Sequence, residues 1–264
     1  MRVCIVTGVP FGGAGATLPA IASTGNVELC CVIVVRGVPQ DRGKMLRRKM
    51  RKILRIGPLG AVNGLRLRKW YHHSDGQDVF ASARRFNIPV VEVNGVNSVE
   101  TISAFRKFDI ELGISLGNGY ISRSTFDVPK FGMINYHGEL LPQYPGALSI
   151  IWPIYFGLTK TGFTIHRIDT GIDTGPILLR QEFDIAFRST LRETVEATGR
   201  IVHPHMPDAI AEVLSNWERL SADARPNTVT RSFTTPTIAE FARMSWNNRK
   251  LFRETVLRRE HAAH

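Results

Sequence analysis

The stretch that decides the fold, residues 2–35, reads RVCIVTGVPFGGAGATLPAIASTGNVELCCVIVV. Its first six residues form a short apolar run that is typical of a buried strand, and a glycine-rich turn follows at residues 8–15. A helix is predicted from near Ala16, and the β-branched run at 27–35 favours a second strand. Strand, glycine turn, helix and strand is how a doubly wound α/β sheet begins. We therefore expect a mostly parallel, Rossmann-like sheet with helices on both faces.

The alternation of helix and strand resumes after a basic segment and predicts the rest of this sheet. Pro204 and Pro207 should break the last long helix, because a proline inside a helix removes a backbone donor. We expect a main domain over 1–215 with a basic insertion at about 40–72, and a short C-terminal extension over 216–264. The predicted helices are 79–85, 97–108, 147–156 and 190–214, and the predicted strands are 89–93, 110–115, 132–136, 161–168, 177–183 and 228–233, before a basic helical tail that ends near Arg259.

The composition is that of an ordinary globular protein with a strong positive charge. Hydrophobic residues make up 43% and charged residues 22% of the chain, and the net charge is +11. No stretch reaches the roughly 20 apolar residues that a membrane span needs. The start of the chain lacks the longer apolar core of a signal peptide, so we expect a cytoplasmic protein. The charge favours anionic partners such as phosphorylated small molecules, nucleic acid or an acidic membrane surface.

The basic segment at residues 42–55, RGKMLRRKMRKILR, has the period of an amphipathic helix. Leu46, Met50, Ile53 and Leu54 fall on one side of such a helix, and the other side is densely cationic. Two interpretations stay open. The helix either packs on the protein through its apolar side, or attracts phosphates or a membrane surface.

The densest cluster of polar residues follows the predicted strand at 132–136. Residues 132–142 read GMINYHGELLP, and alternation along a strand puts Asn135 and His137 on the same face. Ligands of open α/β sheets bind at the carboxyl ends of the strands. An amide and an imidazole there can donate hydrogen bonds to a developing oxyanion, although such a pair also occurs as plain structural support.

A second cluster lies at residues 161–176, TGFTIHRIDTGIDTGP, where a strand runs into a loop with two carboxylates. Asp169 and Asp173 are compatible with simple turn chemistry. A carboxylate near His137 could instead orient its ring and manage a proton during attack by an amine.

Together these segments resemble the formyltransferase family that uses 10-formyltetrahydrofolate, which includes methionyl-tRNA formyltransferase, glycinamide ribonucleotide transformylase and the sugar N-formyltransferases. The family pattern is Asn-x-His, then Leu-Leu-Pro, then Thr-Gly before a strand, then Asp-Thr-Gly-Pro. The matching elements, in the same order and spacing, are Asn135, His137, residues 140–142, residues 161–162 and residues 173–176. The clear match covers roughly residues 110–179.

The resemblance implies roles for particular residues of what would be the catalytic domain, 1–215. Asn135 and His137 would hydrogen-bond the formyl oxygen, and Asp173 would help to manage protons. His166 would serve as structural support, and no metal is implied. The pterin of 10-formyltetrahydrofolate would lie between two backbone loops made of Gly117, Asn118, Gly119, Tyr120, Ile121, Ile168, Asp169 and Thr170.

Several positions depart from the family pattern. Glu139 stands where the family often has serine, and Tyr144-Pro145-Gly146 stands where it often has Tyr-Arg-Gly, which bears on how the acceptor is oriented. The turn at 8–15 lacks the Ser-Asn pair of the transformylases, so a structural turn and a phosphate cradle at a helix N-terminus both stay open. The pairs His72-His73 and His203-x-His205 have no acidic or thiol partners at ligand spacing, and we expect them to be ordinary surface histidines.

For the acceptor, the sequence favours a nucleotide-linked 4-amino sugar of the GDP-perosamine type, used in O-antigen and lipopolysaccharide synthesis. Residues 51–60 and 232–237 resemble family members of that kind. Methionyl-tRNA formyltransferases carry a full β-barrel after the catalytic domain, and about 50 residues follow Leu214 here, too few for one. Glycinamide ribonucleotide transformylases usually stop near the end of the catalytic domain.

The expected partners are a nucleotide sugar and folate, without nucleic acid. Peripheral membrane contact through the basic helix and a homodimer are left open.

Besides the methionyl-tRNA and glycinamide ribonucleotide formyltransferases, one alternative function of another class remains. The chain could be a non-catalytic protein that binds anionic ligands on the same fold.

Overall fold

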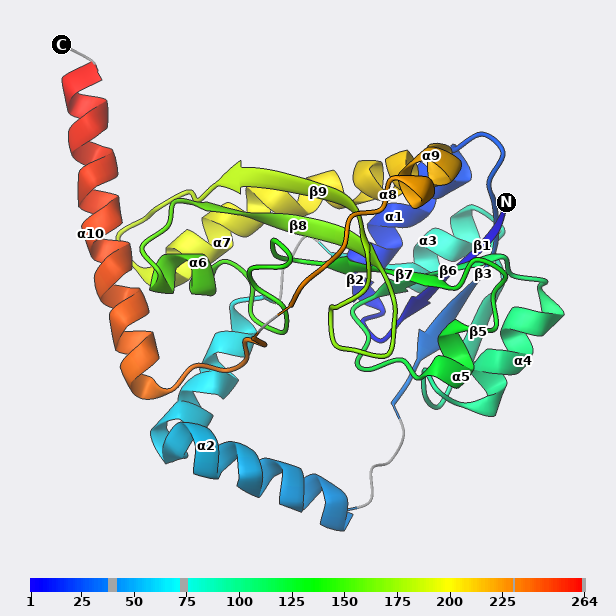
Figure 1. The fold of residues 1–264 in the computed structure, drawn as a ribbon, viewed down its shortest axis with the longest axis horizontal. Helices are drawn as coiled ribbons and strands as arrows, with labels where there is room; N and C mark the ends of the chain where they lie inside the picture. The colour runs from blue at the N-terminus through cyan, green and yellow to red at the C-terminus, as the bar shows by residue number, and fades with distance from the viewer. Residues whose placement is uncertain (38–41, 72–75, 230, 263–264) are drawn as a thin grey trace.

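The computed structural model describes residues 1–37, 42–71, 76–229 and 231–262. Its centre is a seven-stranded sheet in the order β5-β3-β1-β6-β7-β8-β9 (Figure 1). The first five strands in that order pair in parallel, and β8 and β9 are antiparallel additions. The predicted mostly parallel α/β sheet is thus confirmed. The strands are β1 (Arg2–Thr7), β3 (Glu28–Val35), β5 (Val90–Val93), β6 (Leu112–Leu116), β7 (Met133–His137), β8 (Lys160–Arg167) and β9 (Ile177–Asp184).

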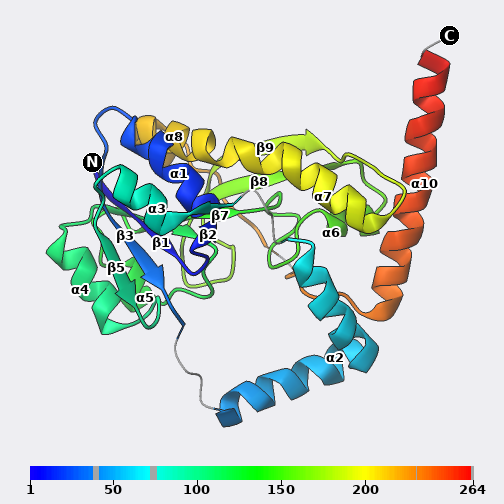
Figure 2. The same cartoon turned by 180° about the vertical axis from the view of Figure 1, so that it is seen from behind.

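Helices cover both faces of this sheet (Figures 1 and 2). Residues of α1, α3, α8 and α9 belong to one apolar cluster with the sheet, and residues of α4 and α5 belong to another. The layers form because the parallel strands are apolar on both sides, which requires cover on both. The helices are α1 (Gly13–Ala22), α3 (Val79–Arg85), α4 (Val99–Lys107), α5 (Arg123–Phe126), α7 (Leu191–Val202), α8 (Met206–Ser215) and α9 (Trp217–Ala222).

Two prolines divide the long helical segment near the end of the sheet, as predicted. A 3-10 turn (His203–His205) separates α7 from α8 and contains Pro204. The start of α7 is fixed by a capping box, in which Thr190 and Glu193 satisfy each other's backbone donors.

The basic segment forms α2 (Arg42–Lys69), which bends at Gly57, where φ is 73°. The half of α2 before this bend extends away from the sheet (Figures 1 and 2). Its apolar residues Leu46, Met50 and Leu54 are exposed, Leu54 to 81%. The interpretation that this helix packs on the protein through its apolar side is therefore wrong.

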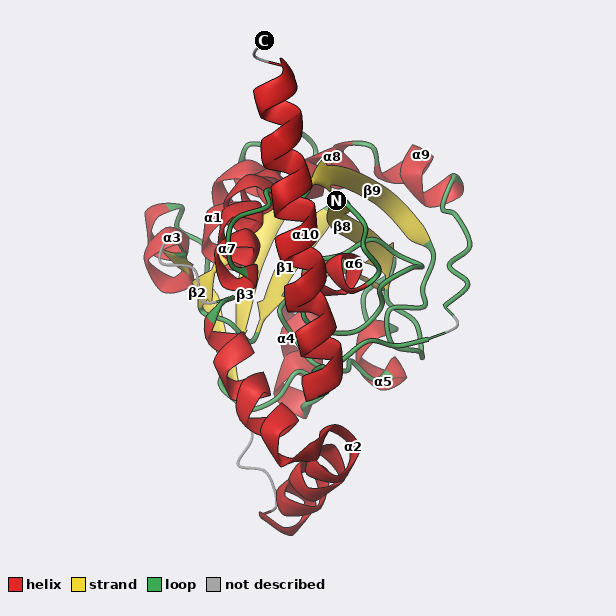
Figure 3. Ribbon diagram, turned by 90° about the vertical axis from the view of Figure 1, so that its left-hand side faces the viewer, coloured by secondary structure: helices red, strands yellow, loops and turns green. Residues whose placement is uncertain are grey.

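The half of α2 after the bend packs on the C-terminal helix α10 (Ile238–Ala262). Leu67 and Trp70 share an apolar cluster with Phe241 and Leu251 of α10 and with α6 (Ile151–Tyr155). Figure 3 shows α10 standing across this end of the molecule. No helix of the described ranges is both long and apolar enough to cross a membrane.

Two predicted elements differ from the structure. The helix predicted over 147–156 begins only at Ile151, because Leu148 and Ile150 have φ of 70° and 71°, outside the helical region. The strand predicted over 228–233 is wrong for the described residues of that range, where Phe233 forms only an isolated parallel bridge with Gly146.

Candidate active site

The carboxyl end of β7 opens into a pocket of about 510 Å³, and Asn135 and His137 both line it. Since β6 and β7 are parallel neighbours, the loop after β6 meets the end of β7 at the same edge of the sheet. The loop after β8 closes the other side. The two polar clusters of the sequence, which the sequence alone could not place together, are therefore adjacent.

Asp173 projects from the loop after β8 towards two histidines. Its Oδ2 lies 3.6 Å from Nδ1 of His137, and its Oδ1 lies 3.6 Å from Nε2 of His166. The backbone N–H of Gly146 donates to Oδ2 at 2.8 Å. Burial alone would raise the pKa of Asp173, but His166 and His137, in their protonated forms, and the Gly146 N–H together hold it below its ordinary value. The carboxylate is thus kept ionised beside the imidazoles.

His137 is buried, and a hydrogen bond to a backbone carbonyl fixes the orientation of its ring. Its Nε2 lies 2.8 Å from the carbonyl oxygen of Tyr144, which can only accept, so Nε2 carries the proton. Burial lowers the pKa of His137, and the charge of Asp173 only partly offsets this. The neutral ring therefore presents Nδ1, as an unprotonated nitrogen, to the side of Asp173.

Asn135 is oriented by His166. Nδ1 of His166 donates to the carbonyl oxygen of Arg167 at 2.8 Å, so its Nε2 is left as an acceptor for Nδ2 of Asn135 at 3.3 Å. The amide then has a second N–H that can donate elsewhere. The expectation that His166 gives support agrees with these contacts, although His166 also lines the pocket.

Most residues expected around a pterin line the pocket. They are Gly117, Asn118, Gly119, Tyr120, Ile121, Ile168 and Asp169, whereas Thr170 is not part of the lining. Asn118 donates to the carbonyl oxygen of Val6 at 2.7 Å, and its buried Oδ1 has no partner among the described residues. A buried acceptor without a partner fits a ligand that donates a hydrogen bond there.

Sequence reasoning missed the contribution of residues beyond 222. Asn227 donates to the carbonyl oxygens of Asp173 and Gly175 at 2.7 and 3.1 Å. Phe233 exchanges backbone hydrogen bonds with Pro145 and Ala147, which flank Gly146. Ser232, Phe233 and Thr234 line the pocket together with Arg55 of α2, which donates to Thr234. No pattern in the sequence signals these contacts, because they join the side chain of Asn227 and the backbone of Phe233 to segments far away in the chain.

The turn at 8–15 begins beside the pocket, where a Cβ on Gly8 would meet the carbonyl oxygen of Gly117 at 3.2 Å, but its residues do not line it. In the turn at 8–15, a Cβ on Gly15 would approach the carbonyl oxygen of Gln77 to 2.5 Å, so close packing against β4 (Gln77–Asp78) explains that glycine. The facing strand β2 (Phe11–Gly12) pairs with β4. His72 and His73 lie outside the described residues. Within the described residues, no group of three or more His, Cys, Asp or Glu side chains could hold a metal ion.

Comparison with known proteins finds a matching family and relatives for this chain. A family model described as formyl transferase matches residues 68–210. A methionyl-tRNA formyltransferase of Acetivibrio thermocellus is 31% identical over 164 residues, which are 52% of this chain and 53% of that protein. The one from Syntrophus aciditrophicus is 37% identical over 140 residues, 53% of this chain and 42% of that protein. The chain thus spans about half the length of the curated relatives it matches.

Solved structures share the fold at low sequence identity. A phosphoribosylglycinamide formyltransferase from Bacillus halodurans has a TM-score of 0.56 at 21% identity, covering 83% of this chain and 98% of that one. An N-formyltransferase from Helicobacter canadensis, in complex with folinic acid and dTDP-3-aminofucose, has a TM-score of 0.54 at 18% identity, covering 88% and 70%. Since the family model matches more than half of the residues, this chain belongs to the formyl transferase family.

Proposed function

We propose that the protein transfers a formyl group from 10-formyltetrahydrofolate to the amino group of a nucleotide-linked 4-amino sugar, of the GDP-perosamine type, in the cytoplasm. The observation that carries the proposal is the meeting of Asn135, His137 and Asp173 on one wall of the pocket. The family match supports the transfer of a formyl group, and the acceptor is inferred from the positive charge beside the pocket and from the structural neighbours.

The contacts of these side chains suggest how they divide the chemistry. Attack of an amine on a formyl carbon builds negative charge on its oxygen, and the second N–H of Asn135 can donate to that oxygen. Nδ1 of neutral His137 can accept the proton that the amine must lose. The imidazolium that forms would face the Asp173 carboxylate 3.6 Å away, which stabilises it. It would then give this proton to N10 of the folate as the bond between the formyl carbon and N10 breaks and tetrahydrofolate leaves. The family resemblance instead gives His137 a hydrogen bond to the formyl oxygen, a bond that this ring can donate from Nδ1 only once that nitrogen is protonated.

Features around the pocket favour a phosphorylated acceptor. Residues 42–69 contain eleven Lys and Arg and no Asp or Glu. Arg55 reaches the pocket wall, and burial, together with the nearby charges of Arg68 and Arg55, lowers the pKa of Lys52. Cations beside a pocket attract phosphate. Structural neighbours described as sugar N-formyltransferases, one bound to a dTDP-linked amino sugar, make a nucleotide sugar a natural acceptor.

A second candidate is formylation of methionyl-tRNA. It is favoured by the curated relatives, which carry that name at 31–37% identity over about half of this chain. The positive charge of α2 suits tRNA as well as a diphosphate.

The two acceptors are separated by a formylation assay. Purified protein and 10-formyltetrahydrofolate would be offered charged methionyl-tRNA, glycinamide ribonucleotide and GDP- or dTDP-linked 4-amino sugars. We expect turnover of a sugar nucleotide; turnover of methionyl-tRNA alone would refute the proposed acceptor. Substitutions H137A and D173N should each lower kcat about 10²- to 10⁴-fold. The control is H205A, since His205 is exposed and does not line the pocket. Full activity of H137A and D173N would refute the proposed roles.

A further inference from the structure

The half of α2 before its bend at Gly57 exposes a row of apolar side chains. Leu46, Met50 and Leu54 are spaced four residues apart and are 60%, 49% and 81% exposed. Residues four apart on a helix lie one above the other, so these three side chains form an apolar row along it. Large apolar side chains that gather in solvent are typical of a surface that a partner covers.

A row of arginines runs beside this apolar row. Arg47, Arg51 and Arg55 each follow one of its residues in the sequence, which places them about 100° further round the helix. All three are exposed. Residues 42–55 contain eight Lys and Arg and no Asp or Glu. This half of the helix therefore presents an apolar row and an arginine row to solvent together.

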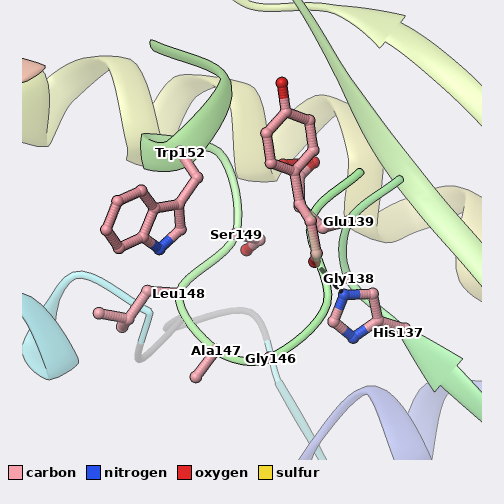
Figure 4. Close-up of a pocket in the computed structure, with 9 residues that line it drawn as sticks. His137, Gly138, Glu139, Gly146, Ala147, Leu148, Ser149 and Trp152 are labelled. Carbon is pink, nitrogen blue, oxygen red and sulfur yellow. Dashed lines mark hydrogen bonds between the residues drawn. The ribbon is translucent and has the colours of Figure 1, made fainter. Parts of the chain in front are cut away.

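The surface made by the two rows stands apart from the reaction centre. Figure 3 shows α2 at the edge of the molecule, beyond the sheet. The apolar row lines neither the large pocket nor the smaller cavity of about 130 Å³ beside His137 that Figure 4 shows. Arg55, at the end of the arginine row, reaches the wall of the large pocket. Changes to the apolar row therefore leave the side chains of the proposed mechanism in place.

The two rows together select the kind of partner. A second copy of this chain, related by a two-fold axis, would bring the same cationic surface against itself, and like charges oppose that contact. A nucleic acid would pair its phosphates with the arginines but leave the apolar row in water. A membrane with anionic phospholipids matches both rows, since phosphates face the guanidinium groups and acyl chains cover the apolar side chains.

The charge of the segment favours a membrane over a groove in another protein. A groove contacts one side of a helix, whereas an anionic membrane attracts all eight cations within about a Debye length, roughly 10 Å at 0.1 M salt. Basic helices with an apolar side lie in the plane of the interface. The contact would be peripheral, because no helix of the described ranges is long and apolar enough to cross a membrane.

We propose that the first half of α2 docks this protein on a membrane surface rich in anionic phospholipids. The apolar row enters between the headgroups, and the arginine row binds their phosphates. This docking surface lies outside the catalytic set, and the proposal does not depend on which acceptor is formylated.

Co-sedimentation of the purified full chain with lipid vesicles tests the contact. Vesicles of phosphatidylcholine alone would be compared with vesicles of phosphatidylcholine and phosphatidylglycerol. We expect at least about tenfold tighter binding to the mixed vesicles, with an affinity that falls as salt rises. Amide hydrogen exchange locates the contact: exchange should slow within residues 42–56 when mixed vesicles are added, and stay unchanged in α4.

Two sets of substitutions separate the two rows. L46Q/M50Q/L54Q removes the apolar row, keeps every charge and introduces residues that form helices well. R47Q/R51Q removes two cations and keeps the apolar row. Each set should weaken binding to the mixed vesicles about tenfold or more, and R47Q/R51Q should also reduce its dependence on salt. Formyl transfer measured without vesicles should be unchanged in L46Q/M50Q/L54Q.

The matched control is R249Q/R253Q, which removes two exposed arginines at the same spacing from α10 and should leave the affinity for vesicles unchanged. Equal binding of wild type and L46Q/M50Q/L54Q would overturn the proposal, because charge alone would then explain the attraction. Absence of binding to both kinds of vesicle would overturn it too, as would a dimer in sedimentation velocity that the apolar substitutions abolish. If L46Q/M50Q/L54Q does not fold, as judged by thermal unfolding, R47Q/R51Q and hydrogen exchange of the wild type still decide.

Discussion

Burial acts differently on the three titratable side chains that surround the proposed reaction centre. It lowers the pKa of His137, and it is outweighed at Asp173 by the histidines and the Gly146 N–H. At Glu139 burial dominates over the bonds from Thr161 and Gly162, and the pKa rises to about 8. The result is a neutral imidazole, an ionised carboxylate and a protonated carboxyl close together at neutral pH, set by their separate contacts.

The raised pKa of Glu139 has a consequence for stability. Above its unfolded pKa near 4.5, the unfolded chain loses this proton while the folded protein keeps it up to about pH 8. The free energy of unfolding should therefore fall between these values, by up to about 1.4 kcal/mol per pKa unit. We expect E139Q to gain stability relative to the wild type from pH 5 to pH 8, with no further change above. Thermal unfolding of both proteins across that range measures the difference.

The other groups near Glu139 do not disturb this comparison. The titratable neighbours coupled to it are Tyr71, Tyr136 and Tyr144, and burial raises the pKa of each above its ordinary value, to about 12 for Tyr144. All three stay neutral between pH 5 and pH 8. Parallel stability curves for the wild type and E139Q would show that Glu139 is ionised in the folded protein.

At the scale of elements, the loop after β7 is held by a segment almost ninety residues later in the chain. Phe233 bonds to the backbone on both sides of Gly146, and the Gly146 N–H bonds to Asp173. Gly146 has φ of 112°, and a Cβ there would lie 2.0 Å from the carbonyl oxygen of Phe233. Only glycine allows this approach.

We therefore expect G146A to act on catalysis through Asp173. The added methyl group must push the segment at Phe233 away or turn the loop, and either change breaks the bond from Gly146 to the carboxylate. The expected result is a loss of kcat of about a hundredfold or more, with a raised pKa of Asp173 in the pH–rate profile. G157A is the control, because Gly157 also has a positive φ but has no atom near its Cβ position. Equal activity of G146A and wild type would contradict this role.

The elements that could be predicted are those whose formation depends on residues close together in the sequence. The period of apolar residues located the strands of the parallel sheet, and Pro204 and Pro207 marked the break between α7 and α8. The pairing of Asn135 with Asp173 came from the family pattern. The positive φ of Leu148 and Ile150 was not predictable, because neither is a residue type that favours it. The support from Asn227 and Phe233 escaped detection because it depends on contacts between segments far apart in the chain.

At the scale of the whole molecule, charge is distributed unevenly. The half of α2 before Gly57 carries much of the excess of cations and lies away from the sheet, and Arg55 at its end reaches the pocket (Figure 1). Exposed charges attract ligands over about a Debye length, roughly 10 Å at 0.1 M salt. Membrane contact through this helix and the formation of a homodimer stay predictions.

This arrangement predicts a salt-dependent KM for a phosphorylated acceptor. Raising the ionic strength should raise KM for the sugar nucleotide and leave KM for an amino sugar without the nucleotide unchanged. The R55A variant should have a higher KM for the sugar nucleotide at low salt, and this KM should change less with ionic strength than in the wild type. R106A is the control, because Arg106 of α4 is exposed and does not line the pocket. An identical salt dependence in wild type and R55A would contradict a role of Arg55 in attracting the acceptor.

The bonds from Asn227 and Phe233 also bear on how this protein could be recombined with its relatives. The family match ends at residue 210, yet both clamps on the Asp173 and Gly146 loops lie beyond it. A chimaera that joined the first 215 residues to a foreign tail would keep Asn135, His137 and Asp173 but lose the hydrogen bonds from Asn227 and Phe233 that hold the loops of Asp173 and Gly146. A segment transferred from this protein to a relative therefore has to extend beyond the family match, which ends at residue 210, and include the residues up to Thr234.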